Sequence, residues 1–251
     1  MKNILLSLVT TLLLVSTACK ESATETNIDT IYYDYFPLKS GYSFVYDIAI
    51  SDSNGVTDTG NRYMQFDDSS IVDGILYSVQ RDSFITLLDT QTKLSFLRKT
   101  EFGVYSYADT SSLSEFIPDS LREYLSADKE IRLLFYPLIL NQRYSVYIIS
   151  VTTAGINVVN IGANVESEEI LNVTLNSAAV QVKTLKIKYT LTVRYGLSPS
   201  DEIKYEAYSW AVKDIGFVKW EGDAEVLNFL FNKIIFPLET NVKMNLVSYL
   251  F

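Results

Sequence analysis

The sequence contains no histidine and only one cysteine, Cys19, in 251 residues. Without histidine, the chain cannot form a Ser-His-Asp triad, a Cys-His dyad, or a His-ligated zinc or haem site. A single cysteine also excludes an internal disulfide and a thiolate metal cluster. Basic residues are few, with 21 Lys and Arg against 30 Asp and Glu, so the net charge is −9. Because nucleic acids are bound through a basic face, we expect no nucleic-acid partner, and we expect no metal or other cofactor.

Proline and glycine are also scarce, with five and ten residues, and no Pro/Gly/Ser-rich linker interrupts the chain. Hydrophobic residues make up 48% and charged residues 20%, which is typical of a folded chain rather than a disordered one. No repeat of fixed period is present. We therefore expect a single β-rich domain over residues 31–251, preceded by two short segments of different character.

The first segment resembles a bacterial lipoprotein signal peptide. Lys2 precedes an apolar run over residues 4–15, which is too short to cross a bilayer. Small residues then lead into Cys19, where a signal peptidase can cut and the cysteine can be joined to lipid. Ser16 stands where Leu or Val is commonest in such motifs. We predict a signal peptide over residues 1–18 and a lipidated Cys19. The alternative is an ordinary signal peptide with Cys19 as an incidental thiol.

Residues 19–30 are polar and contain no apolar side chain larger than Ala before Ile28, so we expect a flexible tether. Lys20 followed by Glu21 is similar to the surface-export signal of some Gram-negative lipoproteins. We therefore expect the chain to lie in the cell envelope, attached to the outer membrane through lipidated Cys19. The periplasmic and the surface face both remain open.

Alternation of apolar and polar residues dominates the remaining sequence and predicts half-buried strands. It is clearest over residues 182–195, where Leu185, Ile187 and Tyr189 share one face with every second residue that follows. The turn at residues 51–55 contains Asn-Gly and predicts a hairpin. Further strands are expected at residues 42–50, 62–66, 75–84, 94–99, 104–108, 203–212 and 217–220, with a last one that begins near Val242 and a turn at residues 89–93.

Helical signals are confined to two places. Ser112 and Glu115 have capping-box spacing before a run of near 3.6-residue period, although Pro118 would break a continuous helix. Residues 225–232 fit either a helix or a strand. We predict a mainly β fold, in which a curved, half-barrel-like antiparallel sheet carries a short helical segment packed against it.

No constellation of residues points to catalysis, so we expect a protein that is not an enzyme. Ser126 and Lys129 have the spacing of a Ser-Lys dyad but lack its companion motifs. Asp52, Asn54 and Asp58 echo part of a calcium loop and are expected to form a solvated turn. The acidic clusters at residues 67–68 and 166–169 lie in turn-like stretches, where paired carboxylates would serve a glycosidase only if they faced one cleft.

The chain is rich in aromatic residues, with 18 Tyr, 13 Phe and 2 Trp. Aromatic side chains fill sheet cores and also line ligand cavities and partner surfaces. As candidates for a ligand or partner surface we select the aromatic residues of two predicted strands: Tyr42, Phe44, Tyr46, Tyr189 and Tyr195.

Two phrases resemble a known family. Residues 35–46 read YFPLKSGYSFVY and residues 212–221 read VKDIGFVKWE. They are similar to the PLxxGxxWxY opening and GxGxVKxE closing phrases of uncharacterised bacterial envelope lipoproteins built from curved antiparallel sheets. Phe44 stands where that family often has Trp, and Asp214 replaces the first Gly of the closing phrase. The resemblance implies a curved sheet and carries no catalytic residues.

Two functions follow as hypotheses. The first is a lipid-anchored envelope protein that acts as a non-catalytic adaptor or binding module. The second is a carrier or sensor that holds a lipid or another apolar ligand inside the curved sheet. A large apolar cavity would favour the carrier, whereas a filled core would favour the binding module.

Overall fold

The computed structural model describes residues 34–108, 123–152, 155–195 and 201–251. The predicted signal peptide, Cys19 and the predicted tether lie outside these residues. The described chain is mostly strand, as the alternating sequence predicts. Its strands are β1 (Ser43–Asp52), β2 (Gly55–Val72), β3 (Ile75–Thr86), β4 (Thr90–Thr100), β5 (Gly103–Tyr107), β6 (Leu125–Ala127), β7 (Glu130–Phe135), β8 (Arg143–Val151), β9 (Ile156–Leu175), β10 (Ala178–Arg194), β11 (Glu202–Val212), β12 (Gly216–Asp223) and β13 (Asn241–Leu250), and helix α3 spans Ala224–Leu230.

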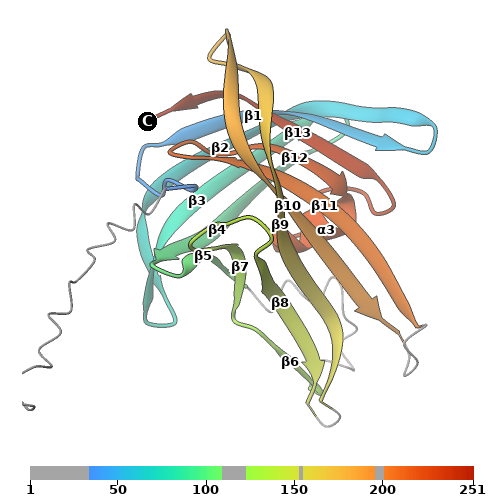
Figure 1. Cartoon of the computed structure of the whole chain (residues 1–251). Coiled ribbons are helices and arrows are strands. Elements are labelled where there is room, and N and C mark those ends of the chain that lie inside the picture. Colours follow the sequence, from blue (N-terminus) through green and yellow to red (C-terminus); the bar gives the residue numbers. More distant parts are fainter. Residues whose placement is uncertain (1–33, 109–122, 153–154, 196–200) are drawn as a thin grey trace, which may run out of the picture. The chain divides into compact units, whose positions relative to one another are not determined.

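All of the strands belong to one antiparallel sheet (Figure 1), in the order β6-β8-β9-β10-β11-β12-β13-β1-β2-β3-β4-β5-β7. The sheet curves strongly, so its two ends come together. Register shifts bend several of its ladders, for example between Phe66 and Ser69 and between Trp210 and Ala211. Extra residues of this kind increase the local twist and let a wide sheet curl. The predicted curved antiparallel sheet is thereby confirmed.

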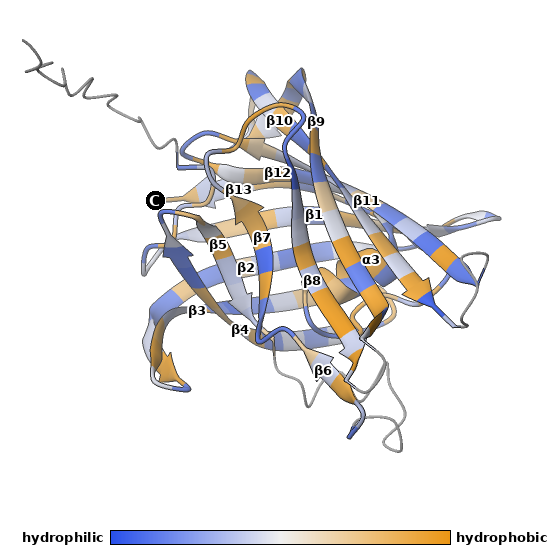
Figure 2. Cartoon of the chain, turned by 60° about the horizontal axis from the view of Figure 1, so that its bottom comes forward, coloured by the Kyte–Doolittle hydropathy of each residue, from blue (hydrophilic) through white to orange (hydrophobic). Residues whose placement is uncertain are grey.

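One face of the sheet is buried and the other is wet, and Figure 2 shows the resulting alternation of hydropathy along the strands. On β10, Leu185, Ile187, Tyr189 and Leu191 are buried, while the intervening Lys186, Lys188, Thr190 and Thr192 are partly exposed. The same rule orders β1, where Phe44, Tyr46, Ile48 and Ile50 point inward. The inward face therefore forms a continuous hydrophobic core.

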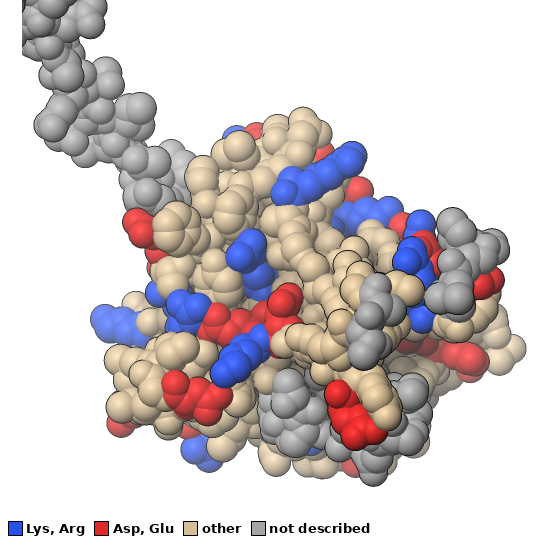
Figure 3. All heavy atoms as spheres, turned by 90° about the horizontal axis from the view of Figure 1, so that it is seen from below, with Lys and Arg blue, Asp and Glu red and all other residues tan. Residues whose placement is uncertain are grey.

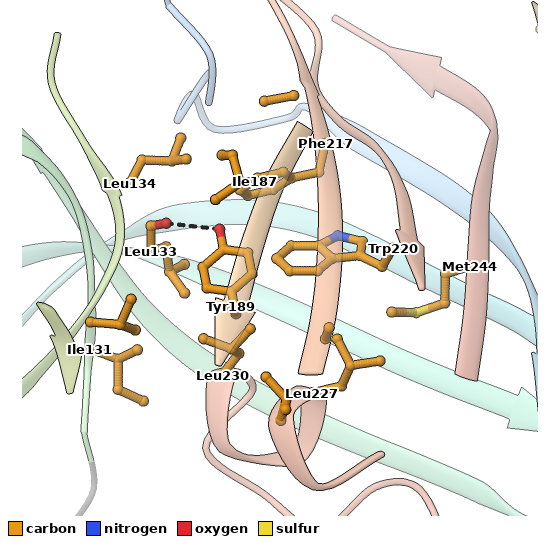
Figure 4. Close-up of a cluster of buried hydrophobic side chains, with 14 of the residues drawn as sticks. Ile131, Leu133, Leu134, Ile187, Tyr189, Phe217, Trp220, Leu227, Leu230 and Met244 are labelled. Atoms are coloured by element: carbon orange, nitrogen blue, oxygen red, sulfur yellow. Dashed lines mark hydrogen bonds between the residues drawn. The ribbon is translucent and has the colours of Figure 1, made fainter. Parts of the chain in front are cut away.

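Helix α3 packs against the inner face of the sheet, where Leu227 and Leu230 lie beside Tyr189 and Trp220 (Figure 4). It resolves the ambiguity over residues 225–232 in favour of a helix. The predicted capping-box segment lies mostly outside the described residues, and at its described end Leu125 is in strand β6.

The opening and closing phrases of the sequence pack against each other. The Tyr46 hydroxyl donates to the carbonyl of Phe217 at 2.8 Å, and the rings of Phe36 and Phe217 lie 5.4 Å apart. Gly216, with φ +106°, supplies the turn before β12, and Asp214 before it is also in the left-handed region. Asp is among the non-glycine residues that adopt positive φ most often, so Asp214 fits the left-handed conformation of this turn.

Several predicted boundaries were wrong. The turn expected at residues 89–93 is shorter, because β4 already begins at Thr90. The acidic clusters expected in turns lie within strands: Asp67 and Asp68 in β2, and Glu166, Glu168 and Glu169 in β9. These carboxylates lie at exposed or partly exposed positions of the strands. A run of such polar residues resembles a loop in the sequence.

A buried asparagine fixes the chain that follows α3. Asn228 is fully buried, and its side-chain carbonyl accepts hydrogen bonds from the backbone N–H groups of Ile235 and Phe236 at 2.9 Å. Its amide donates to the carbonyl of Phe236 at 2.8 Å. One side chain thus satisfies polar backbone groups that would otherwise be buried without partners.

We expect Asn228→Ala to lower the free energy of unfolding by about 2–4 kcal/mol, because several buried polar groups lose their partner together. Urea unfolding followed by circular dichroism measures this change. Asn172→Ala is the matched control, since Asn172 is exposed on β9, and it should change the value by less than about 0.5 kcal/mol. Equal effects of the two substitutions would contradict the assigned role of Asn228.

Candidate functional site

The five aromatic residues proposed from the sequence do not form one surface. Phe44, Tyr46 and Tyr189 are in the core and are 3%, 2% and 0% exposed. Tyr42 is half-buried against the ring of Phe251, at 4.7 Å between centroids. Tyr195, at the end of β10, is 67% exposed. Three other places in the described chain are candidate sites: a polar cluster inside the curved sheet, a groove outside it, and a hollow of about 260 Å³ whose lining includes Ile50, Phe84 and Phe236.

The interior contains a polar cluster beside a small cavity. Arg62 of β2 and Asp82 of β3 form a fully buried ion pair, with Nε and Oδ1 2.8 Å apart. The Gln80 amide donates to the second oxygen of Asp82 at 2.5 Å. The guanidinium of Arg62 also lies over the rings of Tyr46, Phe84 and Phe231, at 4.6–5.5 Å from their centroids. A charge buried in this way is tolerated because its hydrogen-bonding and electrostatic needs are met locally.

The cavity at this cluster has a volume of about 30 Å³, enough for one or two water molecules. Lys93 lines it, and burial lowers the pKa of the Lys93 ammonium to about 8 even though Asp82 acts in the opposite direction. Its remaining lining mixes two serines with apolar side chains: Phe36, Tyr46, Met64, Leu97, Leu133, Phe217, Trp220, Leu230 and Phe231, with Ser95 and Ser106. The interior is therefore essentially filled at this point.

The two ends of the curved sheet meet at a seam between β7 and β8. The two strands lie against each other but share no ladder, since β7 pairs with β5 and β8 pairs with β6 and β9. Leu133 of β7 falls at a register shift and has no partner on β5. Its carbonyl accepts hydrogen bonds from the hydroxyls of Tyr144, at 3.1 Å, and Tyr189, at 3.0 Å; Figure 4 shows the second of these.

Both tyrosines are buried, and burial raises the pKa of each phenol, that of Tyr189 to about 12. The hydroxyls therefore stay protonated and remain donors at any physiological pH. Side chains from β8 and β10 in this way satisfy the Leu133 carbonyl, which has no ladder partner on β5.

On the outer face, the seam lies in a polar depression that we call the seam groove. It consists of two open hollows of about 400 and 650 Å³ that share Ser145. Gly162 of β9 contributes no side chain, which deepens the floor of the larger hollow. Apart from Tyr144, Val146, Ile148, Gly162 and Ala163, the groove is lined by polar, charged or aromatic side chains: Tyr105, Asp128, Lys129, Glu130, Arg132, Arg143, Ser145, Asn160, Asn164, Glu166, Lys188 and Thr190.

Arg132 stands out among these residues. Its guanidinium lies over the rings of Tyr105 and Phe135, at 5.4 and 5.3 Å from their centroids. Its Nε atom is buried and has no hydrogen-bond partner. The neighbouring carboxylate of Glu130 is already occupied, since it accepts from Arg98 Nε at 2.6 Å and from the Tyr77 hydroxyl at 2.7 Å. Burial acts to raise the pKa of Glu130, but these hydrogen bonds outweigh it and the pKa is lowered.

The groove also holds a buried acceptor without a partner, Oδ1 of Asn164. On the face seen from below in Figure 3, Lys and Arg are interspersed with Asp and Glu. The contacts of the acidic clusters do not favour the hypothesis that their carboxylates serve a glycosidase. Asp67 pairs with Arg81 at 2.9 Å, Glu168 with Lys183 at 2.6 Å, and Glu169 accepts from the Trp210 indole at 2.8 Å.

The other sequence candidates have local structural roles. Asp52 accepts from the backbone N–H of Asn54 in the β1–β2 turn, as expected for a solvated turn. Asp58 is instead buried in β2, where its carboxylate accepts from the backbone of Thr59 and Leu87. Ser126 lies in β6 and Lys129 just before β7, so they are not one helical turn apart. Over the described ranges, no three His, Cys, Asp or Glu residues are grouped to hold a metal ion.

Sequence reasoning did not identify the seam groove. Its residues come from β5, β7, β8, β9 and β10, which are far apart in the chain, and no spacing connects them. The single available signal was the polar outer face of β10, which includes Lys188 and Thr190.

We expect Tyr144→Phe and Tyr189→Phe each to lower the free energy of unfolding by about 1 kcal/mol, because one hydroxyl still serves the Leu133 carbonyl. In the double variant that buried carbonyl loses both donors, so the loss should exceed the sum of the single losses by about 0.5–3 kcal/mol. Denaturant unfolding of the four proteins measures the coupling. Tyr63→Phe, on an exposed residue of β2, is the control, and additive effects would contradict the shared acceptor.

No protein-family model matches the chain, and no curated protein matches it. Solved structures are similar at low identity. One is a candidate exported protein with a YmcC-like fold from Bacteroides fragilis: identity is 14%, the TM-score is 0.46, and the match covers 88% of this chain and 99% of that chain. A candidate lipoprotein from Parabacteroides distasonis is 13% identical with a TM-score of 0.40, over 87% of this chain and 99% of that one.

A third similar structure is the hypothetical lipoprotein YmcC from Escherichia coli, at 10% identity and a TM-score of 0.34, over 82% of this chain and 84% of that chain. All three TM-scores are below 0.5.

Proposed function

We propose that this chain is a lipid-anchored protein of the cell envelope, attached to the outer membrane, and that its β domain is a non-catalytic adaptor or binding module. The observation that carries the second part is the contrast between a filled interior and an open polar groove outside. The interior cavity measures about 30 Å³, whereas the hollows of the seam groove measure about 400 and 650 Å³. Ligand sites in proteins commonly have volumes of about 300–1,000 Å³.

The anchor is supported by the sequence around Cys19. An apolar run too short to span a bilayer precedes small residues and the single cysteine of the chain. Two or three acyl chains on one residue hold a protein stably on a membrane. No helix in the described part of the chain is long and apolar enough to cross a membrane.

The same contrast separates the binding module from the alternative, a carrier of an apolar ligand. A carrier needs an apolar cavity large enough for an acyl chain inside the sheet. Here Phe231, Leu230 and Trp220 fill that space together with the Arg62–Asp82 pair. The filled interior at this cluster favours the binding module, and the hollow of about 260 Å³ beside Ile50, Phe84 and Phe236 is the place where a carrier would hold an apolar ligand.

We expect Cys19→Ser to abolish lipidation and to release the protein from the membrane, because the described domain offers no spanning helix. Mass spectrometry of the native protein should find acyl groups on Cys19, and the variant should move from the detergent phase to the aqueous phase on phase separation. Ser22→Ala, in the predicted tether, is the control and should stay in the detergent phase. Retention of the Cys19→Ser protein in the membrane would contradict the anchor.

The binding surface is tested by native mass spectrometry of the full lipidated chain extracted in mild detergent. We expect the wild-type chain to retain a non-covalent ligand or partner, and Ser145→Trp to lose it, because a large ring would then occupy the point at which the two hollows meet. Thr174→Trp, at an exposed position of β9, should retain it. A retained lipid that survives Ser145→Trp would instead favour the carrier.

A further inference from the structure

We infer that the seam groove recognises an oxyanion, a phosphate or carboxylate group on a polar ligand, with Arg132 as the central contact. This inference rests on the proposed function and names the chemistry of the ligand for the same groove. It starts from the way in which the side chain of Arg132 is held.

Arg132 is positioned without using its hydrogen-bond donors. Its guanidinium lies over Tyr105 and Phe135 through cation–π contacts, which occupy the face of the group and leave the N–H groups at its edge free. Its side chain makes no hydrogen bond or ion pair with any residue that the structure describes, and its Nε is buried. Because Nε is buried, the terminal N–H groups of this pre-positioned guanidinium are the donors left for a ligand, and they can bind the oxygens of a carboxylate or phosphate.

The local charge balance favours an anion over a cation. Glu130 is neutralised by Arg98 behind the groove, and Lys188 pairs with Glu206 at 2.6 Å. Asp128 accepts from the backbone N–H of Ile148 at 3.1 Å. Asp128 and Glu166 both keep their negative charge, whereas Lys129, Arg132 and Arg143 form no side-chain ion pair within the described ranges, which leaves three positive charges against two negative ones. The unpaired charge of the groove is therefore positive, in a chain whose net charge is −9.

The other polar groups of the seam groove indicate how a ligand bound at Arg132 would lie in it. Arg143 and Ser145 project from the same face of β8, about 7 Å apart along the strand. Beyond them, the buried Oδ1 of Asn164 has no donor. A ligand that places its acid group at Arg132 and extends past Ser145 would bring a hydroxyl or amide donor to Asn164. The groove thus fits a molecule that carries an acid group and hydrogen-bond donors together.

The test uses the full lipidated chain in neutral detergent micelles, with isotope-labelled arginine so that the Nε–H signals are followed by NMR. Inorganic phosphate is titrated in one arm and acetate in the other, at constant ionic strength. We expect the Arg132 signal to shift saturably in at least one arm. A response to phosphate alone identifies a phosphate ligand, a response to acetate alone a carboxylate ligand, and a response to both a general oxyanion site.

Variants of single arginines distinguish binding at a specific site from non-specific attraction of anions to positive charge. We expect Arg132→Gln to weaken anion binding by about tenfold or more. Arg143→Gln, at an exposed residue that leaves the fold undisturbed, should weaken it several-fold. Arg81→Gln is the matched control, because Arg81 is exposed and pairs with Asp67 elsewhere, and it should leave binding unchanged. If Arg132→Gln fails to fold, Arg132→Lys keeps the charge, loses the planar fork and should still bind more weakly.

The inference is overturned if no arginine signal shifts saturably in either arm, or if binding is unaffected by both Arg143→Gln and the Arg132 variants. Its failure is distinguishable from failure of the proposed function. A ligand that is retained by the wild-type chain and lost in Ser145→Trp would still place binding in the groove, and Arg132 would then not act as an oxyanion contact.

Discussion

The carbonyl of Leu133 is the point on which the closure of this molecule depends. A wide antiparallel sheet that curls until its ends meet has two edges, and each edge exposes backbone donors and acceptors. Here the edges do not join as a ladder. At a register shift in β7, Leu133 has no partner on β5, and the hydroxyls of Tyr144 and Tyr189 donate hydrogen bonds to its carbonyl. Closure by side chains explains why the inner side of the seam is dry while its outer side remains a groove.

The filling of the interior follows from that closure. A curled sheet encloses more space than its own side chains occupy, so another element has to enter it. Helix α3 supplies Leu227 and Leu230 to the core. Asn228 of the same helix holds the following segment, at Ile235 and Phe236, by hydrogen bonds to its backbone. The Arg62–Asp82 pair sits among these residues and is stabilised by the aromatic rings around it. Such a pair is expensive to remove from water, so its presence in a filled core fixes how the inner faces of β2 and β3 pack.

The sequence revealed the parts of the fold that follow a local rule. Alternation in β1 and β10 depends on one dry and one wet face, and the printed residues show it directly. Strands β6 to β9 were not predicted, and in β9 Gly162 and the acidic run after Val165 interrupt the apolar pattern of a twenty-residue strand. Helix α3 was ambiguous because almost all of its residues are buried, which removes the periodic signal.

The candidate groove was beyond sequence reasoning for a different reason. Arg132 is a single basic residue in an apolar strand, and nothing local distinguishes it from a solvated one. Its significance comes from Tyr105, its ladder partner on β5, and from Ser145 on β8, which only the curvature of the whole sheet brings near it. Residues that meet only when the two ends of a sheet come together leave no spacing to recognise. The aromatic residues chosen from the sequence were instead those of the most regular strands, and three of the five are in the core.

The charge of the chain constrains how an anion would reach the groove. With a net charge of −9, the long-range field of the protein repels anions rather than steering them. At physiological ionic strength this field is screened beyond about 8 Å, so the cations of the groove act only on a ligand already close to them. Recognition then depends on short contacts at a guanidinium held by Tyr105 and Phe135. Added salt weakens repulsion from the body of the protein as well as attraction to the groove. Anion binding at this site should therefore depend on salt far less steeply than binding to a basic surface does.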